Sequence, residues 1–531
     1  MTRLLPGLLL LLAGAACQAQ SSALTAGSAE RPTLVVLIAV DQMRADYLDR
    51  FASQLTGGLA RLTREGARFT NAHQDHGWTL TAPGHASLLS GRFPRSTGIL
   101  SNELGVPDPN VSLLDGAPGD GASPHRFVGT TLVDWLRDRS SRSRALAVAG
   151  KDRAAILPVG RSRAQVYWYA ENGRFTTSTY YADSLPDWVR RFNARRSAQR
   201  YAGQAWQLLL PDSAYPEPDS VVLEGYGRNF TFPHWVPSDS VRAADYVQVT
   251  PWLDEIVLGF ALEGLNTLGI GNGPQTDLLS VSLSAMDYIG HRYGPDSREI
   301  HDQVLRLDRA LGAFLDSLFR LRAPERVAIA FSADHGVSRI PEIVGETPMP
   351  TRVDLAPLVE HMSNALRAAG ANPEALIVSP PVMALDRNAL GGRRRLNGDS
   401  IVAAFAAEVK QIPGVLRVDG WRDLQKADPR NDPIARRWQH HFSPNARFDL
   451  VMTLTPGSTW STNVATHGSP HDQDSHVPII FYGPWFRAGR YDEFVRTVDI
   501  APTLAAVVGV RPSERLDGVV LRQVLNGNVS Q

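Results

Sequence analysis

Three aspartates lie directly after apolar segments that are far apart in the chain. Asp41 follows TLVVLIAV, Asp287 follows SVSLSAM, and Asp334 follows AIAFSA. In open α/β sheets ligands bind beyond the carboxyl ends of the strands, so we expect these carboxylates to converge at one edge. Because converging carboxylates repel each other, a cation is needed to hold them together.

Histidines in three short motifs add nitrogen ligands to these carboxylates. His335 stands in DHG, His291 in MDYIGHRYGP and His467 in ATHGSP. Aspartate and neutral imidazole suit zinc, and six such groups are enough for two ions if a further ligand or substrate completes each shell. The hydroxyl of Thr81, in TLTAPGHASLLSG, is the candidate for that further ligand.

Each residue taken alone also has an ordinary structural explanation. Aspartate after a strand is commonly a turn residue or a helix cap, and with 14 histidines in the chain most are not ligands. The joint order is more specific than any one motif. It runs Asp, T-x-P-x-H, D-x-x-x-H, D-H-G and finally H-G.

This order resembles the alkaline phosphatase superfamily, and most closely the threonine-nucleophile alkaline phosphatases related to nucleotide pyrophosphatase/phosphodiesterases. The resemblance extends over about residues 33–520. It implies two Zn²⁺ ions and assigns their ligands residue by residue. One ion would be held by Asp287, His291 and His467, and the other by Asp41, Asp334, His335 and Thr81.

The resemblance also implies that Thr81 is the nucleophile and that a phospho-threonine forms on it. In the family pattern the nucleophile lies two residues before a proline and four before a histidine, as Thr81 does relative to Pro83 and His85. Zinc coordination lowers the pKa of such a hydroxyl, and the amides of a helix start favour the phosphoryl anion. Thr79 is the nearest rival.

A basic motif favours phosphate monoesters over diesters. A monoester dianion presents three non-bridging oxygens, whereas a diester presents two and a second bulky group. Lys151 and Arg153 follow an apolar segment in AGKDRAAILPVG, and the chain has only three lysines against 51 arginines. With Asn102 of GILSNE they resemble the phosphate-binding set of the monoesterases in the family. A solvated basic turn is the structural alternative.

A sulfatase is not expected. Sulfatases need a cysteine or serine, oxidised to an aldehyde, followed by x-P-x-R. This chain has TAPGH at the equivalent place, and its one cysteine is Cys17.

Alternation of strand and helix patterns predicts the fold class. The patterns indicate an α/β three-layer sandwich with a central, mostly parallel sheet, carried by one catalytic domain over residues 20–531. Insertions are expected at about 161–250, which is rich in aromatic residues, and at about 337–447, which is α+β. The segments expected as buried parallel strands are 33–40, 145–150, 277–286, 327–333 and 477–483, and a helix is expected over 302–321.

The first residues resemble an export signal. Residues 1–19 have one basic residue, an apolar run and then small residues, so cleavage near Ala19 would release a periplasmic or secreted protein without a transmembrane segment. A lipoprotein signal, with Cys17 lipidated, is the alternative. The balance of 54 basic and 54 acidic residues gives no bulk attraction for nucleic acid.

The sequence therefore predicts an exported zinc alkaline phosphatase that acts on small phosphate monoesters, with a monomer favoured. The first alternative is a phosphodiesterase or nucleotide pyrophosphatase with the same zinc site. The second is a catalytically silent exported binding protein that keeps the fold.

Overall fold

The computed structural model describes residues 30–343, 345, 349–391 and 396–527. The predicted signal segment and Cys17 lie outside these residues. Among the helices it describes, none is long and apolar enough to span a membrane.

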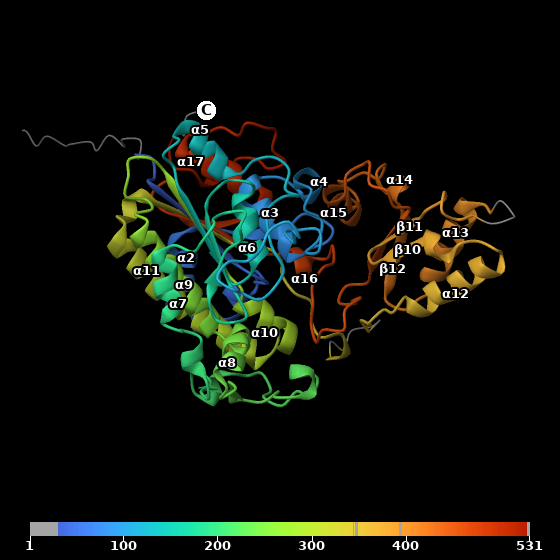
Figure 1. Ribbon diagram of the computed structural model, residues 1–531, viewed down its shortest axis with the longest axis horizontal. Helices are drawn as coiled ribbons and strands as arrows, with labels where there is room; N and C mark the ends of the chain where they lie inside the picture. The colour runs from blue at the N-terminus through green and yellow to red at the C-terminus, as the bar shows by residue number, and fades with distance from the viewer. Residues whose placement is uncertain (1–29, 344, 346–348, 392–395, 528–531) are drawn as a thin grey trace, which may run out of the picture.

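A large sheet forms the centre of the molecule (Figure 1). Within the described residues it has nine strands in the order β15-β2-β14-β9-β1-β8-β3-β4-β5. The bounds are β1 Leu34–Val40, β2 Ala67–His73, β3 Ala145–Ala149, β4 Gln165–Tyr169, β5 Phe175–Thr176, β8 Asp277–Leu283, β9 Val327–Ser332, β14 Ile479–Tyr482 and β15 Gly489–Arg496.

Helices cover both faces of this sheet. On one side lie α2 (Gly58–Glu65), α7 (Asp187–Ala194), α9 (Trp252–Thr267) and α11 (Arg298–Leu321) (Figure 1). On the other lie α3 (Thr81–Ser90), α5 (Leu132–Arg139), α6 (Asp152–Ile156) and α17 (Ile500–Val508). The remaining helices are α1 Tyr47–Arg50, α4 Pro94–Thr97, α8 Ser240–Tyr246, α10 Ala285–Tyr293, α12 Ala356–Ala368, α13 Gly398–Val409, α14 Trp421–Leu424, α15 Pro433–His441 and α16 Asp472–Ser475.

Strand β1 shows why the molecule has three layers. Its seven residues are all buried. Val36 and Ile38 pack into the core on the α9 and α11 side, whereas Val35 and Leu37 pack into the core on the α3 and α17 side. Successive side chains of a strand point to opposite faces, so a continuous apolar run requires cover on both. The predicted α/β fold is confirmed.

Strand direction departs from the prediction at one segment. Strand β1 is parallel to its neighbours β8 and β9, and β3 is parallel to β8 and β4. Strand β14, expected to be parallel, runs antiparallel to both β2 and β9. The apolar run predicted burial correctly, but direction depends on how the chain enters the sheet.

The first part of the aromatic-rich segment lies in the central sheet. Strand β4 extends the central sheet beside β3. Tyr167 and Tyr169 enter the core on the α9 side and Trp168 enters the opposite one. These aromatic residues therefore belong to the main cores of the molecule.

A second sheet lies apart from the first, drawn in orange to the right of Figure 1. Its described strands are in the order β10-β11-β13-β12, with bounds Leu376–Ser379, Val382–Leu385, Leu450–Leu454 and Val415–Gly420 respectively. Helices α12 and α13 pack on it. A two-stranded ribbon, β6 Ala205–Trp206 with β7 His234–Trp235, lies in the first predicted insertion.

Helix α15 attaches the region of the small sheet to the main body. Its Arg436 and His440 reach the buried carboxylate of Asp75, at 3.0 Å and 3.3 Å. The ring of His440 also stacks on Phe93, with the centroids 3.9 Å apart. This second region is therefore fixed beside the segment that leads into α3.

Candidate active site

Adjacent strands bring the three predicted aspartates together. In the sheet β1 lies between β9 and β8. Asp41 follows β1, Asp334 lies two residues beyond β9, and Asp287 lies in the first turn of α10, which follows β8. The backbone N–H of Asp41 donates to the carbonyl of Leu283, 2.9 Å away. The carboxyl ends of three parallel strands thus form one edge, as predicted.

Thr81 is the first residue of α3, and it is buried beside these aspartates. Its Oγ1 lies 3.4 Å from Nε2 of His335. The helix approaches closely because residue 84 is glycine, where an added Cβ would lie 2.3 Å from the carbonyl oxygen of Asp334. The hydroxyl of Thr79, in contrast, donates to the carbonyl of Ser469. The geometry thus favours Thr81 over its rival.

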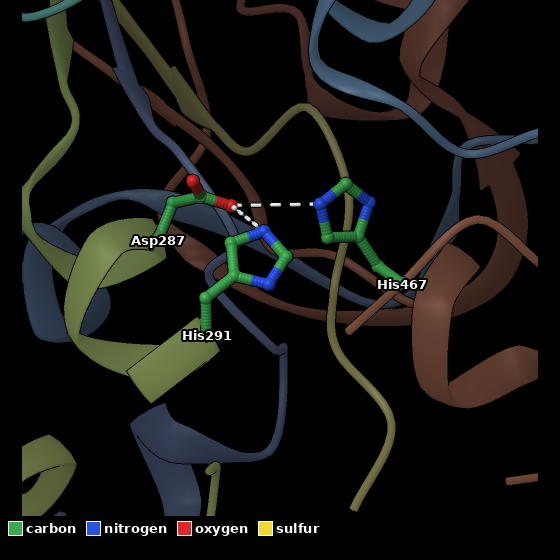
Figure 2. A group of neighbouring side chains, drawn as sticks. All are labelled: Asp287, His291 and His467. Carbon is green, nitrogen blue, oxygen red and sulfur yellow. Dashed lines mark ion pairs between the residues drawn. The ribbon is translucent and has the colours of Figure 1, made fainter. Parts of the chain in front are cut away.

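Asp287, His291 and His467 form what we call the outer group (Figure 2). One ligand atom from each lies within 4.8 Å of the others. Nε2 of His291 is 3.4 Å from Oδ1 of Asp287, and Nε2 of His467 is 3.5 Å from the same oxygen. His291 lies four positions after Asp287, so both project from one face of α10. His467 reaches them from a late loop.

Asp41, Asp334, His335 and Thr81 form what we call the inner group. Nε2 of His335 lies 3.4 Å from Oδ1 of Asp41 and 3.3 Å from Oδ2 of Asp334. Ligand atoms of Asp41, Asp287 and His335 also lie within 4.8 Å of one another, so Asp287 borders both groups. The rings of His335 and His467 stack with their centroids 3.5 Å apart. The two groups are therefore contiguous.

Backbone carbonyls orient all three histidines. Nδ1 of His291 is 2.9 Å from the carbonyl oxygen of Ala465, Nδ1 of His467 is 2.7 Å from that of Thr79, and Nδ1 of His335 is 3.0 Å from that of Gly336. A carbonyl accepts only from a protonated nitrogen, so each Nδ1 carries the proton. Each Nε2 is left with a free lone pair directed toward the aspartates, which is the arrangement of a metal ligand.

Buried carboxylate oxygens that accept no hydrogen bond indicate that the inner group fits a cation. Both oxygens of Asp41 and Oδ2 of Asp334 are buried and accept no hydrogen bond. Burial raises the pKa of Asp41 well above its usual range, and the charges of Asp287 and Asp334 raise it further. The ammonium of Lys151 offsets part of this charge, and a buried carboxylate that is only partly compensated is costly. A donor set of aspartate oxygens and imidazole nitrogens suits a divalent ion such as zinc.

Lys151 reaches the same aspartates from the end of β3. Its Nζ lies 2.6 Å from Oδ2 of Asp41, in an ion pair without hydrogen-bond geometry, and it donates to Oδ2 of Asp287. Burial would lower the pKa of this ammonium, but the charges of Asp287 and Asp41 outweigh burial and raise it. The residue is buried within the site and is not a solvated basic turn.

Asn102 and Arg153 also border the site. Oδ1 of Asn102 accepts from the backbone N–H of Ala82, 2.9 Å away, so its amide nitrogen is left to donate beside Thr81. Nε of Arg153 is buried and has no hydrogen-bond partner. Burial would lower the pKa of the Arg153 guanidinium, but the charges of Asp152 and, less strongly, of Asp41 and Asp287 raise it, so this side chain lies near the same carboxylates.

Two buried residues of the site were not assigned roles from the sequence. Nδ1 of His85 lies 3.0 Å from the carbonyl oxygen of Thr81 and 3.1 Å from Oδ2 of Asp334. The four-residue spacing from Thr81 to His85 was the available signal. Gln42 donates hydrogen bonds to both Asp334 and Asp287. Nothing in its residue type indicates this.

Several known proteins similar to this chain are named alkaline phosphatases. Alkaline phosphatase PafA of Elizabethkingia meningoseptica is 30% identical over 505 residues, covering 91% of this chain and 92% of the relative. Alkaline phosphatase PhoV of Synechococcus elongatus is 30% identical over 534 residues, with 93% of each covered. The crystal structure of wild-type PafA superposes with a TM-score of 0.85, covering 93% of this chain and 99% of that one.

The family profile described as type I phosphodiesterase / nucleotide pyrophosphatase matches residues 35–466. This range begins in β1 and ends one residue before His467. The resemblance read from the motifs is thus confirmed, and the chain belongs to the type I phosphodiesterase / nucleotide pyrophosphatase family, within the alkaline phosphatase superfamily.

Proposed function

We propose that this protein is an alkaline phosphatase that hydrolyses phosphate monoesters to inorganic phosphate and an alcohol. The observation that carries the proposal is the contact of the buried Lys151 ammonium with both Asp41 and Asp287, one aspartate from each ligand group. The two relatives named alkaline phosphatases, at 30% identity over most of the chain, support the same reaction.

Two Zn²⁺ ions are proposed, one in the inner group and one in the outer group. When bound there, they would supply positive charge that lowers the pKa of the Thr81 hydroxyl and stabilises the departing oxygen. The ligands would be Oδ atoms of the three aspartates, Nε2 of the three histidines and Oγ1 of Thr81, listed by group as Asp287, His291, His467 and Asp41, Asp334, His335, Thr81.

In the first step Thr81 Oγ1 attacks phosphorus in line with the ester oxygen. The Oγ1–P bond forms as the bond from phosphorus to the ester oxygen breaks, the threonine proton passes to solvent, and the alkoxide leaves and takes a proton from water. The non-bridging oxygens are bound by Asn102, Lys151 and Arg153. The hydrogen bonds that these residues donate become stronger as negative charge develops on the oxygens.

In the second step water attacks the phospho-threonine. The new P–O bond forms while the P–Oγ1 bond breaks, which releases inorganic phosphate and, after protonation, restores the Thr81 hydroxyl. The same three donors hold the phosphoryl group in both steps, because its non-bridging oxygens keep their places while the groups in line with phosphorus exchange.

The preference for a monoester rests on the number of charged donors. A dianionic phosphoryl group offers a third non-bridging oxygen to Lys151 and Arg153, whereas a diester presents an esterified oxygen that accepts weakly and carries bulk. The two basic residues thus stabilise the monoester transition state more than that of the diester.

The test is the ratio of kcat/KM for p-nitrophenyl phosphate to that for bis-p-nitrophenyl phosphate, measured on zinc-loaded protein. We expect a preference for the monoester by at least about a hundredfold, which corresponds to roughly 2.7 kcal/mol. Preference for the diester would replace the proposal with a phosphodiesterase. Zinc binding with no turnover of either substrate would leave a binding protein.

Export is part of the proposal. Residues 1–19 resemble a signal segment, and the mature protein would act in the periplasm or outside the cell. Mass spectrometry of protein purified from the producing cells should give an N-terminus near Gln20, or a lipidated Cys17. An intact first residue on active protein would contradict export.

A further inference from the structure

Gln42, directly after Asp41, has a backbone conformation that is unusual for its type. Its φ is +68°, in the left-handed region, and its side chain is fully buried. This conformation costs a non-glycine residue roughly 1–2 kcal/mol. The other described non-glycine residues with positive φ are all exposed, namely Asp115, Arg196, Tyr226 and Asn229. Strain retained inside a site indicates a local role.

Gln42 donates to one carboxylate from each ligand group. Its backbone N–H donates to Oδ1 of Asp334, 3.1 Å away, and its Nε2 donates to Oδ1 of Asp287, 2.9 Å away. Asp334 belongs to the inner group and Asp287 to the outer. Because both donors belong to one residue, the two carboxylates are held at a fixed separation.

These hydrogen bonds fix the orientation of the carboxylate groups of Asp334 and Asp287. Oδ1 of Asp334 also accepts from the backbone N–H of His335, 3.0 Å away, so that oxygen is saturated. Oδ2 accepts no hydrogen bond and faces Nδ1 of His85, 3.1 Å away. At Asp287, Nε2 of Gln42 approaches the oxygen to which His291 and His467 point. Outer hydrogen bonds of this kind orient ligands and tune the affinity for a metal.

Helix α10, which packs against the Gln42 side chain, has a glycine where the amide lies. A Cβ added at Gly290, in the middle of α10, would lie 1.8 Å from Oε1 of Gln42. Glycine inside a helix costs about 1 kcal/mol relative to alanine. A strained residue and a helix glycine thus meet at one point between the two ligand groups.

We propose that Gln42 is a positioning residue that sets the geometry of the two metal-ligand groups relative to each other. The inference rests on the proposed function for the identity of the ligands. Its consequence is that the affinity for metal depends on one amide that neither binds the metal nor touches the phosphate donors.

The test compares Gln42→Glu with Gln303→Glu. The first change keeps the size of the side chain and the backbone N–H, but it replaces the donor facing Asp287 with a carboxylate. Gln303 is a matched control, since it is also fully buried and donates from Nε2 to a buried aspartate, Asp254, at 2.9 Å. Zinc dissociation constants from chelator competition, urea unfolding of the metal-free protein, kcat and KM would be measured for both.

We expect Gln42→Glu to weaken zinc binding by about 10- to 100-fold and to lower kcat more than it changes KM. Gln303→Glu should leave zinc affinity within about twofold while it destabilises the metal-free fold as much or more. Zinc affinity of Gln42→Glu within twofold of wild type would overturn the proposal. Because zinc binding is measured without substrate, this outcome is distinct from a failure of the monoesterase assay.

A second variant tests the proposal even if Gln42→Glu does not fold. Gly290→Ala crowds the amide without removing any hydrogen-bonding group, and its effect on zinc affinity should disappear in the Gln42→Gly background. Such non-additivity is expected of residues that act through each other. Equal effects of Gly290→Ala in both backgrounds would contradict the proposal.

Discussion

The outer and inner ligand groups meet at Asp287 but differ in their access to solvent. Asp41, Asp334 and His335 are all fully buried, whereas the side chain of His291 is 21% exposed. The inner aspartates follow strand ends within two residues, while the outer group combines one helix with a late loop. The inner group is thus built into the sheet edge and the outer group closes over it, so loss of a ligand should have different consequences in each.

The largest effect is expected at Thr81, the proposed nucleophile, which belongs to the inner group. Thr81→Ala removes the attacking oxygen, so kcat/KM for p-nitrophenyl phosphate should fall by at least about a thousandfold. The matched control is Thr79→Ala, which keeps the carbonyl that orients His467 and should cost less than about tenfold. The reverse ranking of the two variants would make Thr79 the nucleophile.

The next largest effect is expected at Lys151 and Arg153, the two basic residues proposed to bind phosphate. Two charge-assisted hydrogen bonds contribute about 1.5–3 kcal/mol each, so the Lys151→Ala, Arg153→Ala double variant should lose about 10²- to 10⁴-fold in monoester kcat/KM. Diester kcat/KM, measured with bis-p-nitrophenyl phosphate, should change by less than about tenfold. Equal losses for both substrates would assign these residues to the fold or the metal site.

Removing one ligand from each group tests whether the buried inner group contributes more to zinc affinity than the more exposed outer group. Water can replace an imidazole at the exposed rim, but it has little access to the inner group. Zinc affinity, measured by chelator competition, should therefore fall by more than about 100-fold in Asp334→Asn and by less in His291→Gln. A larger loss in His291→Gln would show that burial does not govern ligand strength here.

The smallest effect is expected outside both groups, where α15 binds Asp75. Burial would raise the pKa of Asp75, but hydrogen bonds and charges from His440 and Arg436 outweigh burial and lower it to about 2. A lowered pKa stabilises the fold above the ordinary value near 3.8, and the contribution disappears as pH falls from there through about 2.

Asp75→Asn should therefore reduce the free energy of unfolding by about 2 kcal/mol at pH 7, and the difference from wild type should shrink below about pH 4. Urea unfolding across this range is the measurement. Asp423→Asn is the control, since that carboxylate is largely exposed beside Lys426 and should have no measurable effect. A constant difference at all pH values would show that the ion pairs do not contribute.

Strand ends were the predictable part of the site. A buried apolar run followed at once by aspartate places the carboxylate at the sheet edge, and the four-residue spacing places His291 beside Asp287 on one helix face. The direction of β14 was predicted wrongly because an apolar run carries no information about chain direction. The aromatic residues of β4 were interpreted as part of an insertion because of their composition. Their side chains in fact alternate between the two faces of the central sheet and pack into both cores.

Gln42 shows what residue types do not reveal. Its role depends on a positive φ, and glutamine has no preference for that region. Gly290 and Gly84 are equally silent in the sequence, since a close approach by a distant segment gives no local signal.

The acceptors that orient the three histidines belong to the main chain. At positions such as Thr79 and Ala465, a substitution that preserves the backbone path keeps the carbonyl in place and keeps the proton on Nδ1. These positions are free to diverge among descendants of the same ancestor without disturbing the imidazoles they hold. Comparison of side chains alone would therefore overlook these histidine contacts, because they depend on the path of the backbone and not on the residue type.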